Sequence, residues 1–410
     1  AGLCAAGAGM NKPAVVVLSS LFPGAAQPLA GIFIRERMFR VARELPLCVV
    51  SPQAWFPGQG AIRVLRPGYR PPQPLFEQQE GIDVHRPRAW CVPAVGRRWD
   101  SQAMARAALP VVRRLRAQGR CDLIDAHFAW PDGHAAALLG RALDVPYTIT
   151  LRGTEPGHLA EPSLRPRVIE ALRGATRVFA VCAALGELGL AAGVPESRVT
   201  VVANGVDCAT FKPLPRALAK VRLGLPPEAR VLCSVGGLVP RKGFHRVIRL
   251  LPRLLARFPT LHYVIAGGGG PEGDWGARLV EEAQAQGVTQ RVHFLGALPP
   301  RELRLPLSAA DALVLPSSNE GWANVLLEAM ACGTPVVASD VGGSREVVAS
   351  PALGYVFPVA DDDALCDRLL AALGRRWDRA VLVRHARSQS WDGRIPALVA
   401  ALRGSAMSDA

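Results

Sequence analysis

The sequence lacks a long uninterrupted apolar run. Nothing approaches the roughly 18 residues that cross a bilayer as a helix, and the longest apolar stretches, such as 14–19, have the length of a β-strand. The first nine residues are small and apolar, but they have neither a basic start nor an apolar core of signal-peptide length. We therefore expect no signal peptide, take Met10 as the expected start, and predict a cytoplasmic protein.

Cysteine pairs at metal-binding or redox spacing are also missing. The nine cysteines, beginning with Cys4, are odd in number and widely spaced, and no CxxC pair occurs. This pattern argues against a disulfide framework and against a zinc site. It favours a reducing compartment in which most of these side chains are buried as small apolar groups.

Lysine is scarce, so arginine carries most of the positive charge. Only four of the 48 basic residues are lysine, and the net charge is +14. Between Ala61 and Arg120 there are twelve arginines against four acidic residues. A field of this kind favours a phosphate-rich or anionic-membrane neighbour, and the alternative is a solvated basic face without a partner. We expect no nucleic-acid partner.

Short apolar runs alternate with amphipathic segments in both halves of the chain. The runs are continuously apolar, which predicts parallel strands covered by helices on both faces. In the first half we expect strands at 14–20, 47–51, 83–85, 123–126, 147–151, 177–181 and 199–202, and helices at 32–44, 101–118, 133–143, 164–173 and 183–192. In the second half we expect strands at 231–235, 262–266, 292–295, 312–315 and 335–338, and helices at 243–257, 274–286, 301–308, 323–332 and 344–349.

These elements predict an α/β fold of two doubly wound, Rossmann-like domains with parallel sheets. The polar, proline-dotted stretch 203–227 is the expected linker, so the domains are expected at 10–203 and 204–385. Sheets of this kind bind ligands at the carboxyl ends of their strands. In a two-domain protein this predicts a ligand in the cleft between the domains.

Two glutamates mark the most informative segment, 317–348. Glu320 follows an apolar strand in a loop, and Glu328 lies inside the next predicted helix. Eight helical residues rise about 12 Å, whereas the two carboxylates of a glycosidase lie about 5–9.5 Å apart. The glutamates are therefore expected to touch different parts of one elongated ligand. The alternative is two surface glutamates beside an Ala/Leu-rich helix, against which the strand–loop–helix–strand frame argues.

A sugar nucleotide has the required length. Glu320 would accept hydrogen bonds from sugar hydroxyls, and Glu328 would accept them from both ribose hydroxyls. Between the two glutamates, the N–H groups of the first helical turn, near 322–326, suit a diphosphate.

Segment 317–348 closely resembles the E-x7-E signature of the family 4 glycosyltransferases of the GT-B fold, in the form EGxxxxxLEAMAxGxPVVAS. Five further segments resemble motifs of this family in order and spacing: DLIDAHFAWPDG (122–133), VVANGVDCATFKP (201–213), VLCSVGGLVPRKGFHRVI (231–248), VIAGGGGPEGD (264–274) and VHFLGALP (292–299). The resemblance implies that a sugar moves from a UDP- or GDP-sugar to an acceptor with retention of configuration, in polysaccharide, glycolipid or exopolysaccharide biosynthesis.

The resemblance also implies a division of labour between the domains. Residues 10–203 would bind the acceptor, 204–385 the nucleotide sugar, and a helix in 386–410 would cross back to the first domain. Lys242 would pair with the diphosphate, a reading supported by the fact that a cation at a helix start is otherwise disfavoured. The family's usual arginine is replaced by Gly237, and Arg241 is the nearest substitute. The implied donor-binding residues are Gly31, Arg241, Lys242, Gly269, Gly321, Trp322, Ala323, Asn324, Val325 and Glu328.

His127 ends a buried strand, at the edge of the sheet where ligands are expected. The resemblance places it against the transferred sugar, so His127 and Glu320 are the expected catalytic residues. The alternative for His127 is a hydrogen-bonded structural role. Three residues that follow the next strand are expected to contact the acceptor or its phosphate: Arg152, Glu155 and His158.

Two motifs resemble known ligand-binding motifs but are interpreted as local structural features. Gly268, Gly270 and Gly273 spell GxGxxG, but Pro271 interrupts the motif and no helix begins until about residue 274, so we expect a turn rather than an NAD site. Asp361–Asp363 is expected to cap and start a helix rather than to bind a metal. We expect no metal or other cofactor, because cationic side chains and a helix N-terminus can stabilise the leaving diphosphate.

Two other functions remain open. A GT-B-fold sugar-nucleotide epimerase would need acid/base groups around the sugar and no acceptor site. A non-catalytic sugar-nucleotide-binding subunit would keep the fold but lose the donor site, and Glu320, Glu328 and Lys242 argue against it. The basic stretch carries Trp90 and Trp99 beside arginines, a combination suited to a lipid interface. It predicts peripheral association with an anionic membrane surface, on its inner face, and a lipid-linked or phosphate-bearing acceptor.

Overall fold

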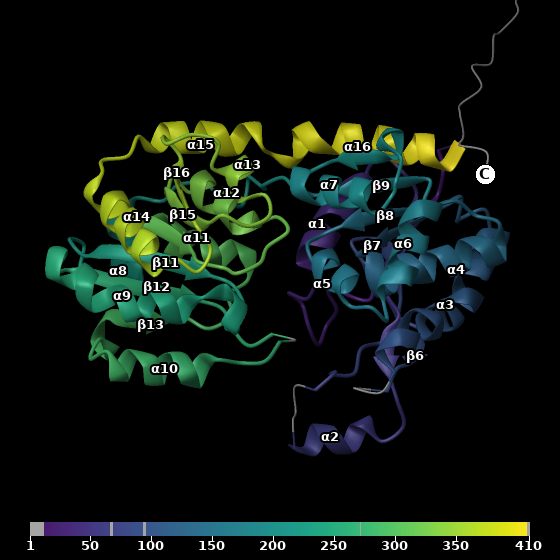
Figure 1. The fold of residues 1–410 in the computed structure, drawn as a ribbon, viewed down its shortest axis with the longest axis horizontal. Helices are drawn as coiled ribbons and strands as arrows, with labels where there is room; N and C mark the ends of the chain where they lie inside the picture. Colours follow the sequence, from purple (N-terminus) through teal and green to yellow (C-terminus); the bar gives the residue numbers. More distant parts are fainter. Residues whose placement is uncertain (1–11, 66–68, 93–95, 271, 408–410) are drawn as a thin grey trace, which may run out of the picture. The chain divides into compact units, whose positions relative to one another are not determined.

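The computed structural model describes residues 12–65, 69–92, 96–270 and 272–407 (Figure 1). Cys4, Met10 and Pro271, named above, lie outside these ranges. Contacts divide the chain into two units. The first takes in the chain up to Ala180, Gly186–Val202 and the chain from Ile395, and the second comprises Val181–Leu185 and Ala203–Arg394.

An eight-stranded sheet forms the centre of the first unit, in the order β10-β9-β8-β7-β1-β2-β5-β4. All pairings are parallel except that of β4 with β5. A separate parallel pair joins β3 (Gln53–Trp55) and β6 (Arg88–Trp90). The strands of the large sheet are β1 (Val15–Leu18), β2 (Leu47–Val50), β4 (Phe76–Gln79), β5 (Ile82–His85), β7 (Leu123–His127), β8 (Tyr147–Leu151), β9 (Arg177–Ala180) and β10 (Val199–Val201).

The helices of the first unit pack on strands that are almost wholly buried, as continuously apolar sequences require. Contacts group α3, α4 and α6, of which α3 packs on β2 and α4 on β7 and β8. The helices are α1 (Ile32–Val41), α2 (Gln59–Leu65), α3 (Asp100–Ala117), α4 (His134–Leu143), α5 (Glu155–Ala160), α6 (Arg165–Gly174) and α7 (Ala183–Ala191). The last helix of the chain is α16 (Trp391–Met407).

The second unit is built on a six-stranded, fully parallel sheet in the order β13-β12-β11-β14-β15-β16. Its strands are β11 (Arg230–Val235), β12 (Leu261–Ala266), β13 (Val292–Phe294), β14 (Ala312–Leu315), β15 (Val336–Ser339) and β16 (Gly354–Phe357). Successive strands are added outward from β11 in one direction and then from β14 in the other. Ligands of such sheets lie beside this reversal point, at the carboxyl ends of the strands.

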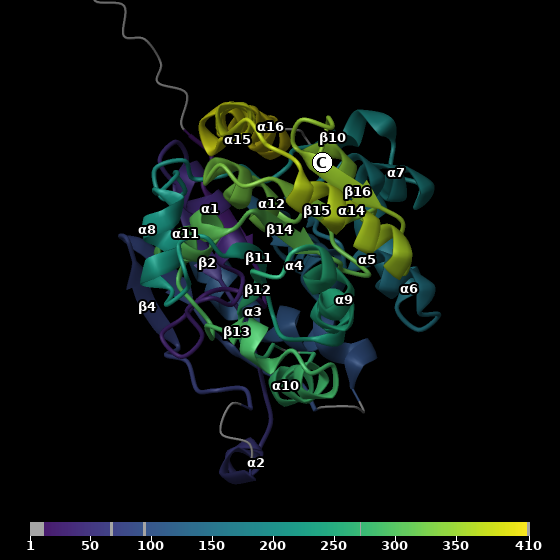
Figure 2. The same cartoon turned by 90° about the vertical axis from the view of Figure 1, so that its left-hand side faces the viewer.

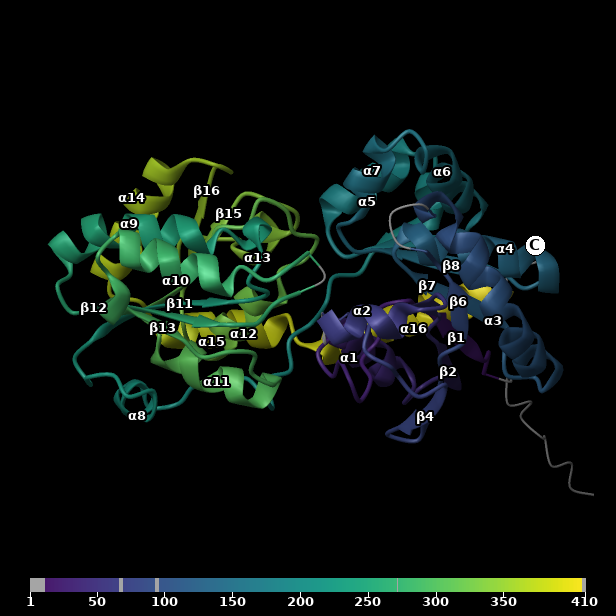
Figure 3. The same ribbon diagram turned by 90° about the horizontal axis from the view of Figure 1, so that it is seen from below.

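Helices cover both faces of this second sheet (Figure 3). On one face α9 packs against α10 and α14, and on the other α11 packs against α12. The helices are α8 (Arg216–Arg222), α9 (Phe244–Arg257), α10 (Gly276–Ala285), α11 (Pro300–Ala309), α12 (Asn324–Ala331), α13 (Ser344–Val347), α14 (Asp362–Gly374) and α15 (Arg379–Ser388).

The predicted fold class is confirmed, and every strand and helix expected from the sequence occurs in order. The capping role of Asp361 is also confirmed, since its carboxylate accepts a 2.8 Å hydrogen bond from the Ala364 N–H at the start of α14. The expected linker contains a helix of its own, α8. The interval from Glu320 to Glu328 is only half helical, because α12 begins at Asn324, so the predicted rise of eight helical residues is wrong.

Candidate functional site

The carboxyl ends of β11 and β14 bring Lys242 and Glu320 together in the second unit. Lys242 ends a helical turn that follows β11, and Glu320 lies in the loop that follows β14. The Lys242 Nζ atom donates a hydrogen bond of 2.6 Å to Glu320 Oε1, and the two side chains are only 15% and 11% exposed. The pair therefore lies at the reversal point of the sheet, where ligands of this fold bind.

The Arg241 side chain also lies beside Glu320. Its guanidinium forms a forked ion pair with Glu272, with NH2–Oε1 at 2.8 Å and Nε–Oε1 at 3.1 Å. Its NH1 donates to the Asn319 carbonyl at 2.9 Å and lies 3.7 Å from Glu320 Oε1. The hydrogen bond from Arg241 lowers the pKa of Glu272. Two cations and two carboxylates thus neutralise one another at this edge of the sheet.

Glycines allow the loops of this site to pack closely against one another. Gly243 has a positive φ of 71°, and a Cβ there would lie 2.3 Å from the Pro316 carbonyl oxygen, so the first turn of α9 can meet the loop after β14 only with glycine at this position. The GxGxxG segment is a turn, as predicted, because Gly270 and Gly273 exchange backbone hydrogen bonds of 2.8 and 3.0 Å and α10 begins only at Gly276. Gly269 lies in this same segment.

Residues 321–325 lead from the loop into α12. Gly321, Trp322 and Ala323 are buried, and Asn324 and Val325 are half-buried. No side chain caps this helix, while the N–H groups of Asn324 and Leu326 donate to the Trp322 and Ala323 carbonyls, both at 3.1 Å. The helix therefore begins four residues after Glu320 in the chain. Glu328 follows one turn later and is half-buried.

Trp322 is held against the loop after β15. A Cβ at Gly343 would lie 2.4 Å from the indole ring, and the Gly343 N–H donates to the Gly321 carbonyl at 2.9 Å. The Trp322 Nε1 atom is buried and has no hydrogen-bond partner among the described residues. Buried indole N–H groups usually have a hydrogen-bond partner, so this one is an exception in the site.

In the first unit, the loops after β1, β7 and β8 meet at the corresponding edge of the large sheet. His127 ends β7 and is fully buried. Its Nδ1 accepts hydrogen bonds from Arg152 Nε at 3.1 Å and NH2 at 2.9 Å. Its Nε2 lies 3.5 Å from Asp125 Oδ2. Burial, followed by the charges of Arg152 and Arg37, lowers the pKa of His127 well below its usual value, so the ring is neutral and carries its proton on Nε2.

Glu155 shapes the loop that carries Arg152. Its fully buried carboxylate accepts backbone N–H groups of Ala129 at 3.3 Å, Arg152 at 3.1 Å and Gly153 at 2.7 Å. Arg152 is 8% exposed, and its guanidinium lies 5.1 Å from the Phe33 ring centre. Of the three residues expected to contact an acceptor, only His158, on α5, is partly exposed.

Asp132 and Gly31 position the loop after β1. The buried Asp132 carboxylate accepts the Ser20 N–H at 2.9 Å and the Ser20 hydroxyl at 3.1 Å, and burial raises the pKa of Asp132 to about 7. Gly31 has a φ of 69°, and a Cβ there would lie 2.4 Å from the Leu21 carbonyl oxygen. The donor-binding role expected for Gly31 stays a prediction. Asp132 was not predicted, although it follows shortly after the buried strand that ends at His127.

Most cysteines of the described chain are buried, as expected. Seven of its eight cysteines are buried, and Cys208 is half-buried. Within the described ranges, no three His, Cys, Asp or Glu side chains gather as metal ligands would. None of the described helices is long and apolar enough to cross a membrane.

Two protein-family models match the chain. The one described as Glycosyl transferases group 1 matches residues 216–389, which include Lys242 and Glu320. The one described as Glycosyltransferase Family 4 matches residues 60–210, which include His127.

Curated relatives carry glycosyltransferase names. The chain is 33% identical over 312 residues to the D-inositol 3-phosphate glycosyltransferase of Thermomonospora curvata, a match that covers 70% of this chain and 72% of that protein. It is 35% identical over 266 residues to the enzyme of the same name from Frankia alni, a match over 61% of this chain. In that comparison the chain spans 65% of the relative's length.

Solved structures share the fold along nearly the whole chain. Sucrose-phosphate synthase from Thermosynechococcus elongatus matches with a TM-score of 0.75 and 22% identity, over 96% of this chain and 98% of that one. HepE of Anabaena in complex with UDP matches with a TM-score of 0.71 and 20% identity, over 95% and 100%. At these identities the likeness shows the fold alone.

Proposed function

Because the chain belongs to the family 4 glycosyltransferases of the GT-B fold, we propose that it transfers a hexosyl group from a UDP- or GDP-sugar to an acceptor with retention of configuration. The observation that carries this proposal is the Lys242–Glu320 pair at the reversal point of the second sheet. It sets a cation suited to a diphosphate beside a carboxylate suited to sugar hydroxyls. Complexes of the structural neighbour HepE contain UDP and UDP-glucose, which supports this class of donor.

The donor-binding roles follow from the charges at the site. Lys242 and Arg241 are each paired with a carboxylate, Glu320 and Glu272, and a bound diphosphate would take over part of this pairing. The N-terminus of α12, with the Trp322 indole N–H, supplies further donors to the diphosphate or sugar. Glu328, one turn into the helix, would accept the ribose hydroxyls. We propose that these groups stabilise the leaving diphosphate without a metal.

For retention, the new bond must form on the face of the sugar from which the old bond leaves. We assign no covalent nucleophile, because we propose that Glu320 accepts hydrogen bonds from the sugar instead. In the proposed step, the bond from the anomeric carbon to the diphosphate oxygen breaks and the acceptor oxygen bonds to that carbon on the same face. The acceptor hydroxyl proton passes to the leaving diphosphate oxygen. Lys242 and Arg241 stabilise the charge that develops there.

His127 is proposed to contact the transferred sugar through Nε2, which makes no hydrogen bond within the described part of the chain. Since the ring is fully buried, this contact requires residues around it to move. The burial of Arg152 and Glu155 favours positioning roles for both residues. Arg152 fixes the His127 ring through Nδ1, and Glu155 fixes the loop of Arg152. His158 is the residue proposed to contact the acceptor directly.

The acceptor is proposed to be lipid-linked or phosphate-bearing, and the protein to bind an anionic membrane surface peripherally. The name of the relatives, D-inositol 3-phosphate glycosyltransferase, refers to a phosphorylated compound. In the basic stretch, Trp90 and Trp99 are 64% and 52% exposed and Val64 on α2 is 82% exposed. The Arg98 guanidinium lies 5.2 Å from the Trp99 ring centre. Exposed indoles beside arginines suit the headgroup region of a bilayer.

A thermal-shift screen against UDP-, GDP-, ADP- and dTDP-sugars tests the donor assignment. A ligand at about 100 times its Kd should stabilise the protein by about 2.7 kcal/mol. The matching sugar nucleotide is then incubated with acceptor extracts, and NMR of the product reports the anomeric configuration. Conversion of the free sugar nucleotide without acceptor would instead identify an epimerase, and stabilisation without any turnover would identify a binding subunit. No stabilisation by any of the four would contradict the proposal.

A further inference from the structure

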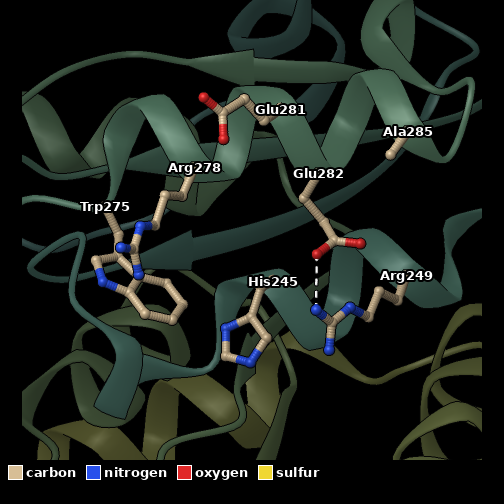
Figure 4. Close-up of a pocket in the computed structure, with 7 residues that line it drawn as sticks. All are labelled: His245, Arg249, Trp275, Arg278, Glu281, Glu282 and Ala285. Atoms are coloured by element: carbon tan, nitrogen blue, oxygen red, sulfur yellow. Dashed lines mark hydrogen bonds and ion pairs between the residues drawn. The ribbon is translucent and has the colours of Figure 1, made fainter.

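A groove of about 420 Å³ lies between α9 and α10 on the surface of the second unit. The two helices lie side by side in both Figure 1 and Figure 2. Figure 4 shows the side chains of both helices that line the groove, of which Arg249 and Glu282 face each other and Glu281 points away from α9. They are His245 and Arg249 from α9, and Trp275, Arg278, Glu281, Glu282 and Ala285 from the start and body of α10.

The groove is distinct from the donor residues but adjoins them in sequence. His245 follows Lys242 by three residues, and Trp275 follows Glu272 by three. The imidazole of His245 lies 5.4 Å from the Trp275 ring, and the Arg278 guanidinium lies 5.1 Å from the same ring. Together they form an aromatic wall with polar edges at one end of the groove.

The charges of the lining cancel. Arg249 and Arg278 supply two positive charges, and Glu281 and Glu282 two negative ones. Burial, with the charge of Arg249, lowers the pKa of His245, which keeps its ring neutral. An Arg249–Glu282 ion pair of 2.8 Å lies at the end of the groove away from Trp275. The His245 Nδ1 atom is buried without a hydrogen-bond partner in the described structure.

The balanced charges and the aromatic wall of the groove favour one class of ligand over others. An anion would meet Glu281 and Glu282, and a cation would meet Arg249 and Arg278. A wholly apolar molecule would cover charged groups without replacing their bonds to water, which is costly. A neutral polyhydroxyl compound avoids all three penalties, because each hydroxyl both donates and accepts and because its C–H face packs on an indole ring. The volume also falls in the usual range for small-molecule sites.

We infer that the α9–α10 groove is a second, non-catalytic binding site for a neutral sugar. The sugar could be a free monosaccharide or a unit of a longer glycan, and these two sources are separated by the test. The inference does not require the transfer reaction, since its test measures binding at Trp275 rather than activity.

The experiment uses the full-length protein labelled with ¹⁵N at the indole of its eight tryptophans. Trp275→Phe identifies the Trp275 indole signal in the spectrum. Glucose, galactose, mannose and N-acetylglucosamine are titrated, followed by maltotetraose, cellotetraose, mannotetraose and chitotetraose. We expect at least one sugar to shift the Trp275 signal saturably, with a Kd on the order of millimolar. A tetrasaccharide that binds far more tightly than its monomer indicates a glycan, and equal affinities indicate a monosaccharide.

Two arginines of α9 provide a matched pair of variants. Arg249 and Arg253 are both 53% exposed, and each makes an ion pair of 2.8 Å, with Glu282 inside the groove and with Asp363 outside it. Arg249→Ala should weaken sugar binding by about fivefold or more, while Arg253→Ala should leave the Kd within about twofold. Absence of any Trp275 shift up to about 50 mM sugar, equal effects of the two variants, or a shift caused by inorganic phosphate instead would overturn the inference.

Discussion

Lys242 and Glu320 are 78 residues apart in the chain and form a hydrogen-bonded ion pair of 2.6 Å. Each side chain is therefore held in a fixed position by the other before a donor binds. A diphosphate that approaches Lys242 must compete with the carboxylate, and a sugar that approaches Glu320 meets an acceptor already oriented. If the diphosphate binds Lys242 as proposed, its binding would release Glu320, the residue proposed to hold the sugar.

The two signature glutamates should separate binding from turnover. Glu328→Ala should weaken binding of the free nucleoside diphosphate by the roughly 1.5–3 kcal/mol of a charged hydrogen bond, about 10- to 150-fold. Glu320→Ala should not weaken that affinity, because it removes the carboxylate that competes with the diphosphate for Lys242. It should strongly reduce turnover, because the proposed partner of Glu320 is the sugar. Isothermal titration with UDP and GDP measures the first effect, and the transfer rate the second. Unchanged nucleotide affinity in Glu328→Ala would remove the ribose assignment.

The few lysines of the chain make Lys242 easy to isolate experimentally. Lys242→Ala should lower affinity for the nucleoside diphosphate by about tenfold or more, but affect the nucleoside alone much less, because the lost contact is with phosphate. Lys212→Ala is the control, since that lysine is exposed and far along the chain from the site. Equal losses for nucleoside and diphosphate would show that the substitution disturbed the fold of the site rather than a phosphate contact.

The sequence predicted the layered fold because continuous apolar runs leave few alternatives to buried parallel strands. It missed β3 and β6, whose three residues each are too short to show a pattern, and it also missed the four-residue strands β4 and β16. It located Arg241 but not its partner Glu272, which lies 31 residues away and reaches the site only because a glycine-rich turn folds back.

The burial of individual carboxyl groups could not be predicted from the local sequence pattern either. Glu155 was expected to face a ligand, yet its carboxylate is fully enclosed by three backbone N–H groups. Asp125, at the centre of β7, was read as part of an apolar strand, and burial raises its pKa to about 6. Such groups are recognised only when the surrounding elements are in place, because each depends on partners from distant parts of the chain.

Metal independence is a direct consequence of the proposed donor chemistry. Activity should survive exhaustive treatment with EDTA, because Lys242, Arg241 and the N-terminus of α12 are proposed to stabilise the diphosphate. The transfer rate is compared before and after chelation, with a metal-dependent glycosyltransferase treated in parallel as the control. Complete loss of activity that only Mg²⁺ or Mn²⁺ restores would contradict this assignment.

Asp132 should make stability depend on pH. Its pKa of about 7 is raised by burial, so the folded protein holds a proton that the unfolded chain releases near pH 4. The stabilisation linked to this proton is therefore full below about pH 4 and is lost as the pH rises toward 7. Asp132→Asn keeps an acceptor for the Ser20 N–H and cannot ionise, so the variant should gain Tm relative to the original protein between pH 5 and about pH 8.

Differential scanning fluorimetry at several pH values measures this difference. Asp363→Asn is the control, because that carboxylate is 88% exposed and paired only at the surface. A difference in Tm between Asp132→Asn and the original protein that stays constant from pH 5 to about 8 would show that Asp132 does not titrate in this range.

Membrane association should depend on the arginines beside Trp99 rather than on total charge. Each exposed basic residue contributes about 1 kcal/mol near an anionic surface, screened within about 8 Å at physiological salt. Co-sedimentation with anionic vesicles at low salt should recover the protein in the pellet, and high salt or neutral lipid should release it. Replacing Arg97 and Arg98 with glutamate should abolish binding. The same replacement at Arg113 and Arg114, exposed on α3, changes the net charge equally and should weaken binding far less. If both variants lose binding alike, the protein is attracted to the vesicles by its total charge and not by the arginines beside Trp99. If the original protein never sediments, the arginines have no membrane partner, and a small soluble acceptor becomes the better hypothesis.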